Sequence, residues 1–162
     1  MFIGREKELN ALNALYNSDK FEFVVLYGRR RVGKTELIKH FIDDKNAIYF
    51  TGVESNAKQN LENLSTSILE YVSEIEGAET SFVSFQAALD AVFKLSFNKR
   101  VVLAIDEYPY VARVSKSFAS TIQMLIDKYK NSILICVFVN SFPLFGFPCR
   151  TKQPKILLNL FR

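Results

Sequence analysis

Cysteine, histidine and tryptophan are scarce in this chain of 162 residues, which contains two cysteines, one histidine and no tryptophan. The two cysteines, Cys136 and Cys149, are too few for the disulfide framework of a small secreted domain. One histidine, His40, with scattered cysteines does not provide the ligand spacing of a zinc site. The G-x-S-x-G turn of a serine hydrolase is also missing. The sequence therefore excludes a disulfide-rich scaffold and gives no support to zinc or Ser-His-Asp chemistry.

Long hydrophobic runs and a strong charge imbalance are missing as well. No apolar run reaches the roughly 18 residues that a membrane helix requires, and the opening residues MFIGREKEL do not resemble a signal peptide. Lysine and arginine number 21 against 17 acidic residues, and this net charge of +4 is too small to indicate nucleic-acid binding by itself. Hydrophobic residues make up 49% of the chain, enough for one domain with a core. We therefore expect a cytoplasmic protein without a membrane partner.

Apolar runs alternate with helix-like segments along most of the chain. Strands are expected at residues 21–27, 46–51, 101–105 and 132–141, and helices at 5–17, from 34 onward, 55–75, 84–95 and 117–129. The third and fourth apolar runs lack polar alternation, which is typical of parallel strands buried on both faces. Strands that alternate with helices predict an α/β fold with an open, mostly parallel sheet.

The end of the sequence departs from this alternation. Residues 1–140 are expected to form the main domain, and residues 141–162 an irregular, shortened C-terminal segment in which residues 155–161 could form a last strand. A parallel strand needs a connection of a dozen or more residues, usually a helix. Residues 141–154 have barely that length, and Pro143, Pro148 and Pro154 interrupt any helical pattern. The C-terminal part of the fold is therefore expected to be incomplete.

The motif that carries most of the chemistry follows the first strand. Residues 28–35 read G-R-R-R-V-G-K-T, which fits the pattern G-x-x-x-x-G-K-[ST] of a phosphate-binding loop. In such a loop the backbone N–H groups and the following helix N-terminus hold phosphate oxygens. Lys34 would reach the β- and γ-phosphates of a nucleotide, and the Thr35 hydroxyl would ligate Mg²⁺. The candidate nucleotide-binding residues are Gly28, Arg29, Arg30, Arg31, Val32, Gly33, Lys34, Thr35 and Glu36.

Polar residues that follow the third and fourth strands are candidates for the rest of the site. Asp106 and Glu107 end the apolar run 101–105, at the sheet edge where α/β proteins bind ligands. Asp106 would hold Mg²⁺, and Glu107 would orient and deprotonate the attacking water. Asn140 would lie between the γ-phosphate and that water. An isolated acidic pair is more often a cap or a solvated turn, and Asn140 could simply end its strand. The upstream phosphate loop favours the functional interpretation of the acids.

Together these segments resemble the archaeal-type ATPases of the AAA+/STAND group, prokaryotic proteins that often carry a C-terminal nuclease-like domain. The resemblance rests on MFIGREKEL, YGRRRVGKTELI, AIYFTG and VVLAIDEYPY, and it covers roughly residues 1–132. It implies a three-layer P-loop fold of the ASCE class, in which the strand bearing the acids lies one place away from the loop strand. It also implies that Phe2, Ile3 and Gly4 lie near the adenine, with Arg5 close by. From the residues alone, Phe2 and Ile3 would be a hydrophobic staple before a helix.

The chain departs from this family after its fourth strand. Val139, Asn140, Ser141 and Phe142 stand where family members usually have C-G-S-S. The stretch PCRTKQPKILL resembles a shortened form of a later G-R-R-T segment, with Arg150 at one of its arginines. We therefore expect a truncated form of a longer ATPase, without the helical lid and later domains.

Three functions remain open from the sequence. The first is Mg²⁺-dependent ATP binding and hydrolysis by a P-loop ATPase domain, with a homo-oligomer or further C-terminal domains as partners. The second is an ATP-binding switch, or a non-hydrolysing remnant of a longer ATPase. The third is a DNA-associated module that binds through Arg29 to Arg31. A small-molecule kinase is disfavoured, because no acceptor site is recognisable beside the Asp-Glu pair.

Overall fold

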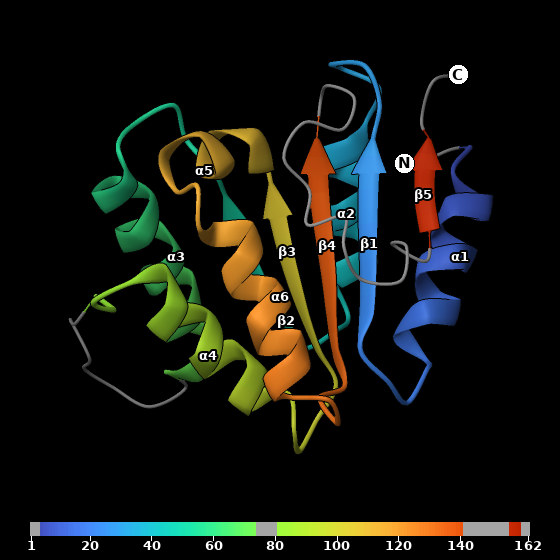
Figure 1. The fold of residues 1–162 in the computed structure, drawn as a ribbon. Coiled ribbons are helices and arrows are strands. Elements are labelled where there is room, and N and C mark those ends of the chain that lie inside the picture. Colours follow the sequence, from blue (N-terminus) through green and yellow to red (C-terminus); the bar gives the residue numbers. More distant parts are fainter. Residues whose placement is uncertain (1–3, 74–80, 141–155, 160–162) are drawn as a thin grey trace.

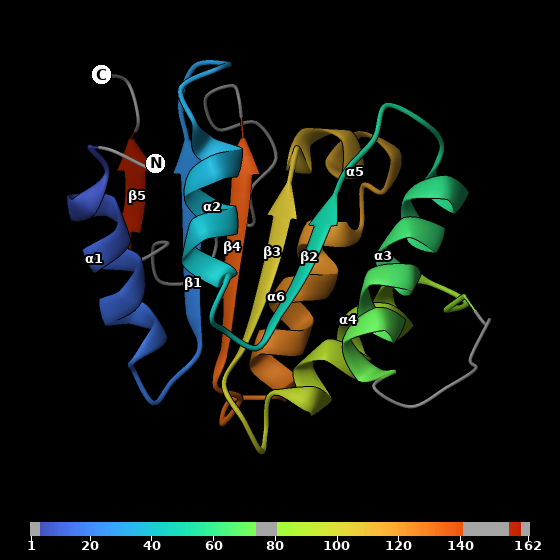
Figure 2. The same ribbon diagram turned by 180° about the vertical axis from the view of Figure 1, so that it is seen from behind.

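The computed structural model describes residues 4–73, 81–140 and 156–159, and these form one five-stranded parallel sheet with helices on both faces (Figures 1 and 2). The strands are β1 (Glu22–Tyr27), β2 (Ala47–Thr51), β3 (Val101–Asp106), β4 (Leu134–Asn140) and β5 (Ile156–Asn159). Their spatial order is β2-β3-β4-β1-β5. This arrangement confirms the predicted three-layer P-loop fold.

The order of the strands decides which residues can meet at the carboxyl edge of the sheet. β4 lies between β1 and β3 and pairs in parallel with both. The strand that ends in Asp106 is therefore one place away from the strand that leads into the phosphate loop, as the family resemblance implies. Because all strands run in the same direction, Tyr27, Asp106 and Asn140 end at the same edge.

Six helices occur in the described residues, and they divide between the two faces of the sheet. They are α1 (Glu6–Tyr16), α2 (Lys34–Ile42), α3 (Ala57–Val72), α4 (Phe85–Leu95), α5 (Tyr108–Val114) and α6 (Phe118–Lys128). Helices α1 and α2 cover one face, while α4, α5 and α6 lie on the other together with α3 (Figures 1 and 2). The phosphate loop thus enters a helix on the face opposite to the one that carries α5.

Two apolar clusters hold these layers together. On one face, Leu37, Ile38 and Phe41 of α2 pack with Leu12 of α1 against the sheet. On the other face, α3, α4, α5 and α6 bury the larger cluster, in which Tyr108 stacks on Phe138 at 4.7 Å between ring centroids. Every residue of β3 and β4 is buried, which explains why both strands read as continuous apolar runs. Helices packed on both faces therefore fix the position of the sheet edge at which Asp106 lies.

Helix α4 begins where the sequence predicts a helix, whereas helix α5 was not predicted. The Ser84 hydroxyl accepts a hydrogen bond from the N–H of Ala87 at 3.1 Å and so caps α4. Helix α5 was missed, because its seven residues include Pro109 near the start and are too few to show helical periodicity. Strand β5 falls within the range expected for a last strand, while residues 141–155 lie outside the described residues.

Candidate functional site

The phosphate-loop motif connects β1 to α2 without interruption. β1 ends at Tyr27, and α2 begins at Lys34 with Gly33 as its N-cap residue. Gly33 adopts φ +84°, a left-handed conformation that costs glycine little. Because Gly33 has no side chain, it cannot cap the first N–H groups of α2. A helix N-terminus without a side-chain cap leaves N–H groups that can bind an anion. The start of α2 is therefore suited to bind a phosphate group.

Lys34 folds back over its own loop. Its side chain is only 6% exposed, and its Nζ donates hydrogen bonds to the carbonyl oxygens of Gly28 at 2.9 Å and Arg29 at 2.7 Å. Burial lowers the pKa of Lys34 below its usual value, while the nearby carboxylates of Glu107 and Asp106 oppose that shift. The ammonium group therefore lies inside the loop, close to both acids.

The first turn of α2 and the end of β3 meet through the Asp106 carboxylate. The Thr35 hydroxyl donates to Asp106 Oδ2 at 2.7 Å, although 71 residues separate the two in sequence. The Tyr49 hydroxyl donates to the same oxygen at 3.0 Å, and the Glu107 N–H donates to Oδ1 at 2.8 Å. Asp106 is 3% exposed, so these three donors satisfy a buried carboxylate. Burial raises the pKa of Tyr49 to about 12, and its hydroxyl stays a donor at neutral pH.

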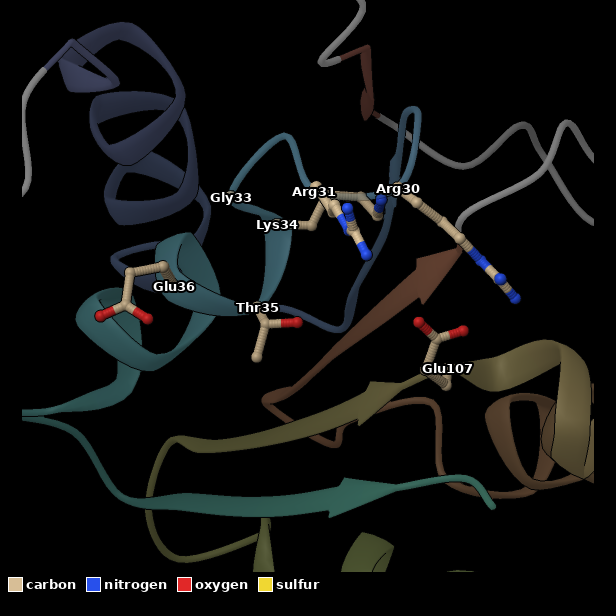
Figure 3. A pocket seen from close by; sticks show the side chains of 7 residues that line it. All are labelled: Arg30, Arg31, Gly33, Lys34, Thr35, Glu36 and Glu107. Atoms are coloured by element: carbon tan, nitrogen blue, oxygen red, sulfur yellow. The ribbon is translucent and has the colours of Figure 1, made fainter. Parts of the chain in front are cut away.

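Glu107 lies across a pocket from the loop. Figure 3 shows its carboxylate facing Arg31, Lys34 and Thr35. The pocket has a volume of about 540 Å³, and its lining residues are Arg30, Arg31, Gly33, Lys34, Thr35, Glu36 and Glu107. Six of these seven belong to the predicted loop set, and the seventh is the predicted base. Glu36 lies on the far side of Thr35 from Glu107 in this view.

The other predicted residues occupy different positions. Arg29 is exposed and supplies a carbonyl oxygen to Lys34. Val32 is half-buried, and its carbonyl oxygen accepts a hydrogen bond from the Arg5 guanidinium at 3.1 Å. Gly4 is exposed, while Phe2 and Ile3 lie outside the described residues. The predicted contact of these N-terminal residues with adenine therefore stays a prediction.

Asn140 ends β4 and pairs in register with Tyr27 of β1. It is 2% exposed and is not among the residues that line the pocket. Its place between the loop strand and the acidic strand is the one predicted for a residue that contacts the γ-phosphate or the attacking water. Its role stays a prediction.

Two residues next to the site were missed by sequence reasoning. Tyr49 contacts Asp106 as described above, and Gly52 follows β2 and donates its N–H to the Asp106 carbonyl oxygen at 2.9 Å. Their only sequence signal is a position near the end of a strand. The contacts depend on β2 lying beside β3, which the local sequence does not show.

The donor set fits a nucleotide with Mg²⁺. Mg²⁺ prefers oxygen ligands and usually combines one or two protein oxygens with phosphate oxygens. Thr35 Oγ1 and the Asp106 carboxylate supply such oxygens beside the loop, and Lys34 supplies a positive charge within it. The residues present could therefore hold Mg²⁺ together with a nucleoside triphosphate.

No helix within the described ranges is long and apolar enough to cross a membrane.

Comparisons with other sequences identify relatives in an archaeon. An uncharacterized protein of Methanocaldococcus jannaschii is 32% identical over 127 residues, which are 78% of this chain and 26% of that protein. An uncharacterized ATP-binding protein of the same organism is 51% identical over 45 residues, which are 28% of this chain and 76% of that protein. The match to the first of these relatives thus spans about a quarter of that protein's length.

Solved structures share the fold at low sequence identity. A Walker-type ATPase of Pyrococcus abyssi has a TM-score of 0.68 and 18% identity, over 99% of this chain and 53% of that chain. A structure of Drosophila ORC bound to DNA has a TM-score of 0.71 and 16% identity, over 99% of this chain and 43% of that chain. These similarities show the fold alone.

A family model also matches most of the chain. Residues 2–142, which include the loop, the acidic pair and the first four strands, match the family described as an ATPase domain predominantly from Archaea. This match agrees with the P-loop topology and with an ATP-binding relative. The chain belongs to this family of archaeal-type P-loop ATPase domains.

Proposed function

We propose that this domain binds ATP with Mg²⁺ and hydrolyses the γ-phosphate. The observation that carries the proposal is the meeting of Thr35 and Asp106 at 2.7 Å, beside Lys34 and across the pocket from Glu107. Two separate motifs thus converge at one edge of the sheet. In this proposal, hydrolysis would change the conformation of this domain, and that change would be transmitted to attached domains or neighbouring subunits.

ATP binding would use the loop and the start of α2. Backbone N–H groups and the α2 N-terminus would hold the β-phosphate. Lys34 would exchange its two carbonyl partners for β- and γ-phosphate oxygens, which are stronger acceptors because they are charged. Arg30 and Arg31 line the same pocket and would add positive potential at its mouth. Binding thus requires a change of partners for Lys34.

Hydrolysis would use the residues at the ends of β3 and β4. Thr35 and Asp106 would hold Mg²⁺, which when bound neutralises charge on the phosphates. Glu107 would accept a proton from a water molecule as the water oxygen forms a bond to the γ-phosphorus. The bond between the γ-phosphorus and the bridging oxygen would break, leaving ADP and inorganic phosphate. Asn140 would orient the water or contact the γ-phosphate.

Thermal unfolding with ATP tests the binding part of this proposal. At an ATP concentration one hundred times Kd, with excess Mg²⁺, binding should add about 2.7 kcal/mol of stability. For a domain of this size we expect a rise in Tm of roughly 5–10 °C. The rise should be smaller with EDTA, because Thr35 and Asp106 then have no cation to hold. Absence of any shift at millimolar ATP with Mg²⁺ would mean that this chain does not form the proposed site.

A binding switch without useful turnover is a second candidate, because residues supplied by other domains or chains often complete sites of this kind. A steady-state ATPase rate above that of a Lys34→Ala variant would reject this candidate. Binding without turnover, by contrast, would favour it over hydrolysis.

Nucleic-acid binding through the arginine triplet is a third candidate. Arg29, Arg30 and Arg31 are all exposed. One of the solved structures with a similar fold, that of Drosophila ORC, is described as bound to DNA. If the triplet neutralises three phosphates, the slope of log K against log salt should be about −2.7 for duplex DNA. Fluorescence anisotropy with a labelled duplex from 50 to about 200 mM salt would measure this slope. DNA binding that does not change with salt, or that requires ATP, would contradict it.

A further inference from the structure

The described pocket lining includes neither β2 nor Gly52, which follows it, yet Tyr49 of β2 hydrogen-bonds to Asp106 and Gly52 lies close to the Glu107 main chain. The Tyr49 hydroxyl donates to Asp106 Oδ2 at 3.0 Å. The Gly52 N–H donates to the Asp106 carbonyl oxygen at 2.9 Å, which extends the pairing with β3 past its last residue. A side chain at position 52 would approach the Glu107 carbonyl oxygen. Both hydrogen bonds therefore go to Asp106, while the missing side chain of Gly52 leaves room for the Glu107 main chain.

From these positions we infer that Tyr49 and Gly52 are positioning residues, Tyr49 for the Asp106 carboxylate that would hold Mg²⁺ and Gly52 for the main chain of Glu107. The inference rests on the proposed function, since it assigns the orientation of the two acids used there to β2 and the glycine that follows it.

The Tyr49 part follows from how the Asp106 oxygens are shared. Oδ2 accepts from Thr35 and Tyr49, and Oδ1 accepts from the Glu107 N–H. Thr35 is itself a candidate metal ligand, so its hydroxyl would have to serve the cation as well as Asp106. Tyr49 comes from the adjacent strand and would keep its hydrogen bond to Oδ2 whether or not the cation is bound. It can therefore fix the carboxylate in the orientation that the cation needs.

The Gly52 part follows from the space around it. A Cβ atom at position 52 would lie 2.7 Å from the Glu107 carbonyl oxygen and 3.0 Å from Val111 Cγ2. The first distance is too short for a real contact, and a backbone oxygen cannot rotate away as a side chain can. Glu107 has φ +48° and is the N-cap residue of α5. A side chain at position 52 would therefore push the main chain that sets the direction of the Glu107 carboxylate.

Replacement of Tyr49 by phenylalanine tests the first part through the Mg²⁺ dependence of ATP binding. We expect Tyr49→Phe to raise the Mg²⁺ concentration for half-maximal ATP-induced stabilisation by about tenfold, as for other residues that orient metal ligands. The weaker shift with ATP in EDTA should not change. Tyr71→Phe is the matched control, because the buried Tyr71 hydroxyl lies on α3 and has no hydrogen-bond partner within the described residues.

Replacement of Gly52 by alanine tests the second part by separating binding from turnover. We expect Gly52→Ala to lower kcat by a factor of about ten or more, since small displacements of catalytic groups have large effects. The Kd for ATP should stay within about twofold, because no loop residue moves. A Gly52→Ala/Val111→Ala double variant removes the contact with the Val111 side chain but keeps the one with the Glu107 carbonyl oxygen. It should remain slow if the Glu107 main chain is what matters.

Several results would overturn the inference. Equal Mg²⁺ dependence in Tyr49→Phe and Tyr71→Phe would reject the role of Tyr49. Recovery of kcat in the double variant, or loss of folding in Gly52→Ala, would show that Gly52 serves packing and does not position Glu107. A wild-type protein with no Mg²⁺-dependent shift would instead reject the proposed function itself, so the two failures can be told apart.

Discussion

Replacement of Glu107 by glutamine is expected to abolish ATP hydrolysis and leave ATP binding unchanged. The amide keeps the size of the side chain but cannot accept a proton from water. A general base contributes typically 10²–10⁴-fold to rate, so kcat should fall by about that factor. Glu107 lies across the pocket from the loop, and its amide analogue keeps the shape of that wall, so the Kd for ATP should stay near the wild-type value. Phosphate release in steady state, together with the ATP-induced rise in Tm, measures the two properties separately.

The matched control for this variant is Glu62→Gln, which removes the same charge from helix α3, outside the pocket. It should have the hydrolysis rate of the wild-type protein. If Glu107→Gln lost binding and hydrolysis to the same degree, Glu107 would be a binding residue and its assignment as the base would be wrong. A rate unaffected by the substitution would contradict the assignment equally.

Replacement of Lys34 by alanine should remove most of the ATP binding. The ammonium group is the only charged group buried within the loop in the described part of the chain, and hydrogen bonds to charged groups contribute about 1.5–3 kcal/mol each. Loss of one such bond to phosphate corresponds to a Kd higher by about 10- to 160-fold, and loss of a second bond would raise the Kd further. At one hundred times the wild-type Kd, the ATP-induced rise in Tm should then fall to about half of the wild-type rise or less.

The control for the lysine variant is Lys58→Ala, because Lys58 is exposed on α3 and, among the described residues, forms an ion pair only with Glu62, at 3.8 Å. Such surface pairs contribute little, so its ATP binding and its Tm should stay close to those of the wild-type protein. ATP binding by Lys34→Ala with the wild-type Kd would show that the nucleotide does not use this loop. It would therefore contradict the proposed site as a whole.

The parts of the fold that sequence reasoning predicted are those with local signals. Residues 28–35 match a pattern whose spacing is itself a structural requirement, and the buried strands β3 and β4 are visible as unbroken apolar runs. The family resemblance supplied the position of the acidic strand one place away from the loop strand, which periodicity alone does not determine. With that order, the convergence of Thr35 and Asp106 follows from parallel strands ending at one edge.

The parts that escaped prediction depend on contacts between distant segments. Tyr49 and Asp106 are 57 residues apart, and in sequence Tyr49 is simply an aromatic residue within a strand. The Arg5 side chain reaches the Val32 carbonyl oxygen across 27 residues, which links the start of the chain to the phosphate loop. Nothing in the sequence around Gly52 marks it as important. Its importance comes from having no Cβ atom at a position where such an atom would meet the Glu107 carbonyl oxygen. Neither spacing nor composition could show these three contacts.

The left-handed backbone at Arg31 has a consequence for which sequences this loop can tolerate. Arg31 has φ +64°, a conformation that costs a residue with a Cβ atom about 1–2 kcal/mol, and asparagine or glycine less. The motif treats residues 29–32 as interchangeable, yet stereochemistry makes position 31 more selective than its neighbours. Valine, isoleucine and threonine, whose branched Cβ atoms fit this region worst, should be the rarest substitutions to survive there. Of the three consecutive arginines, the third is therefore the one whose backbone restricts its replacement.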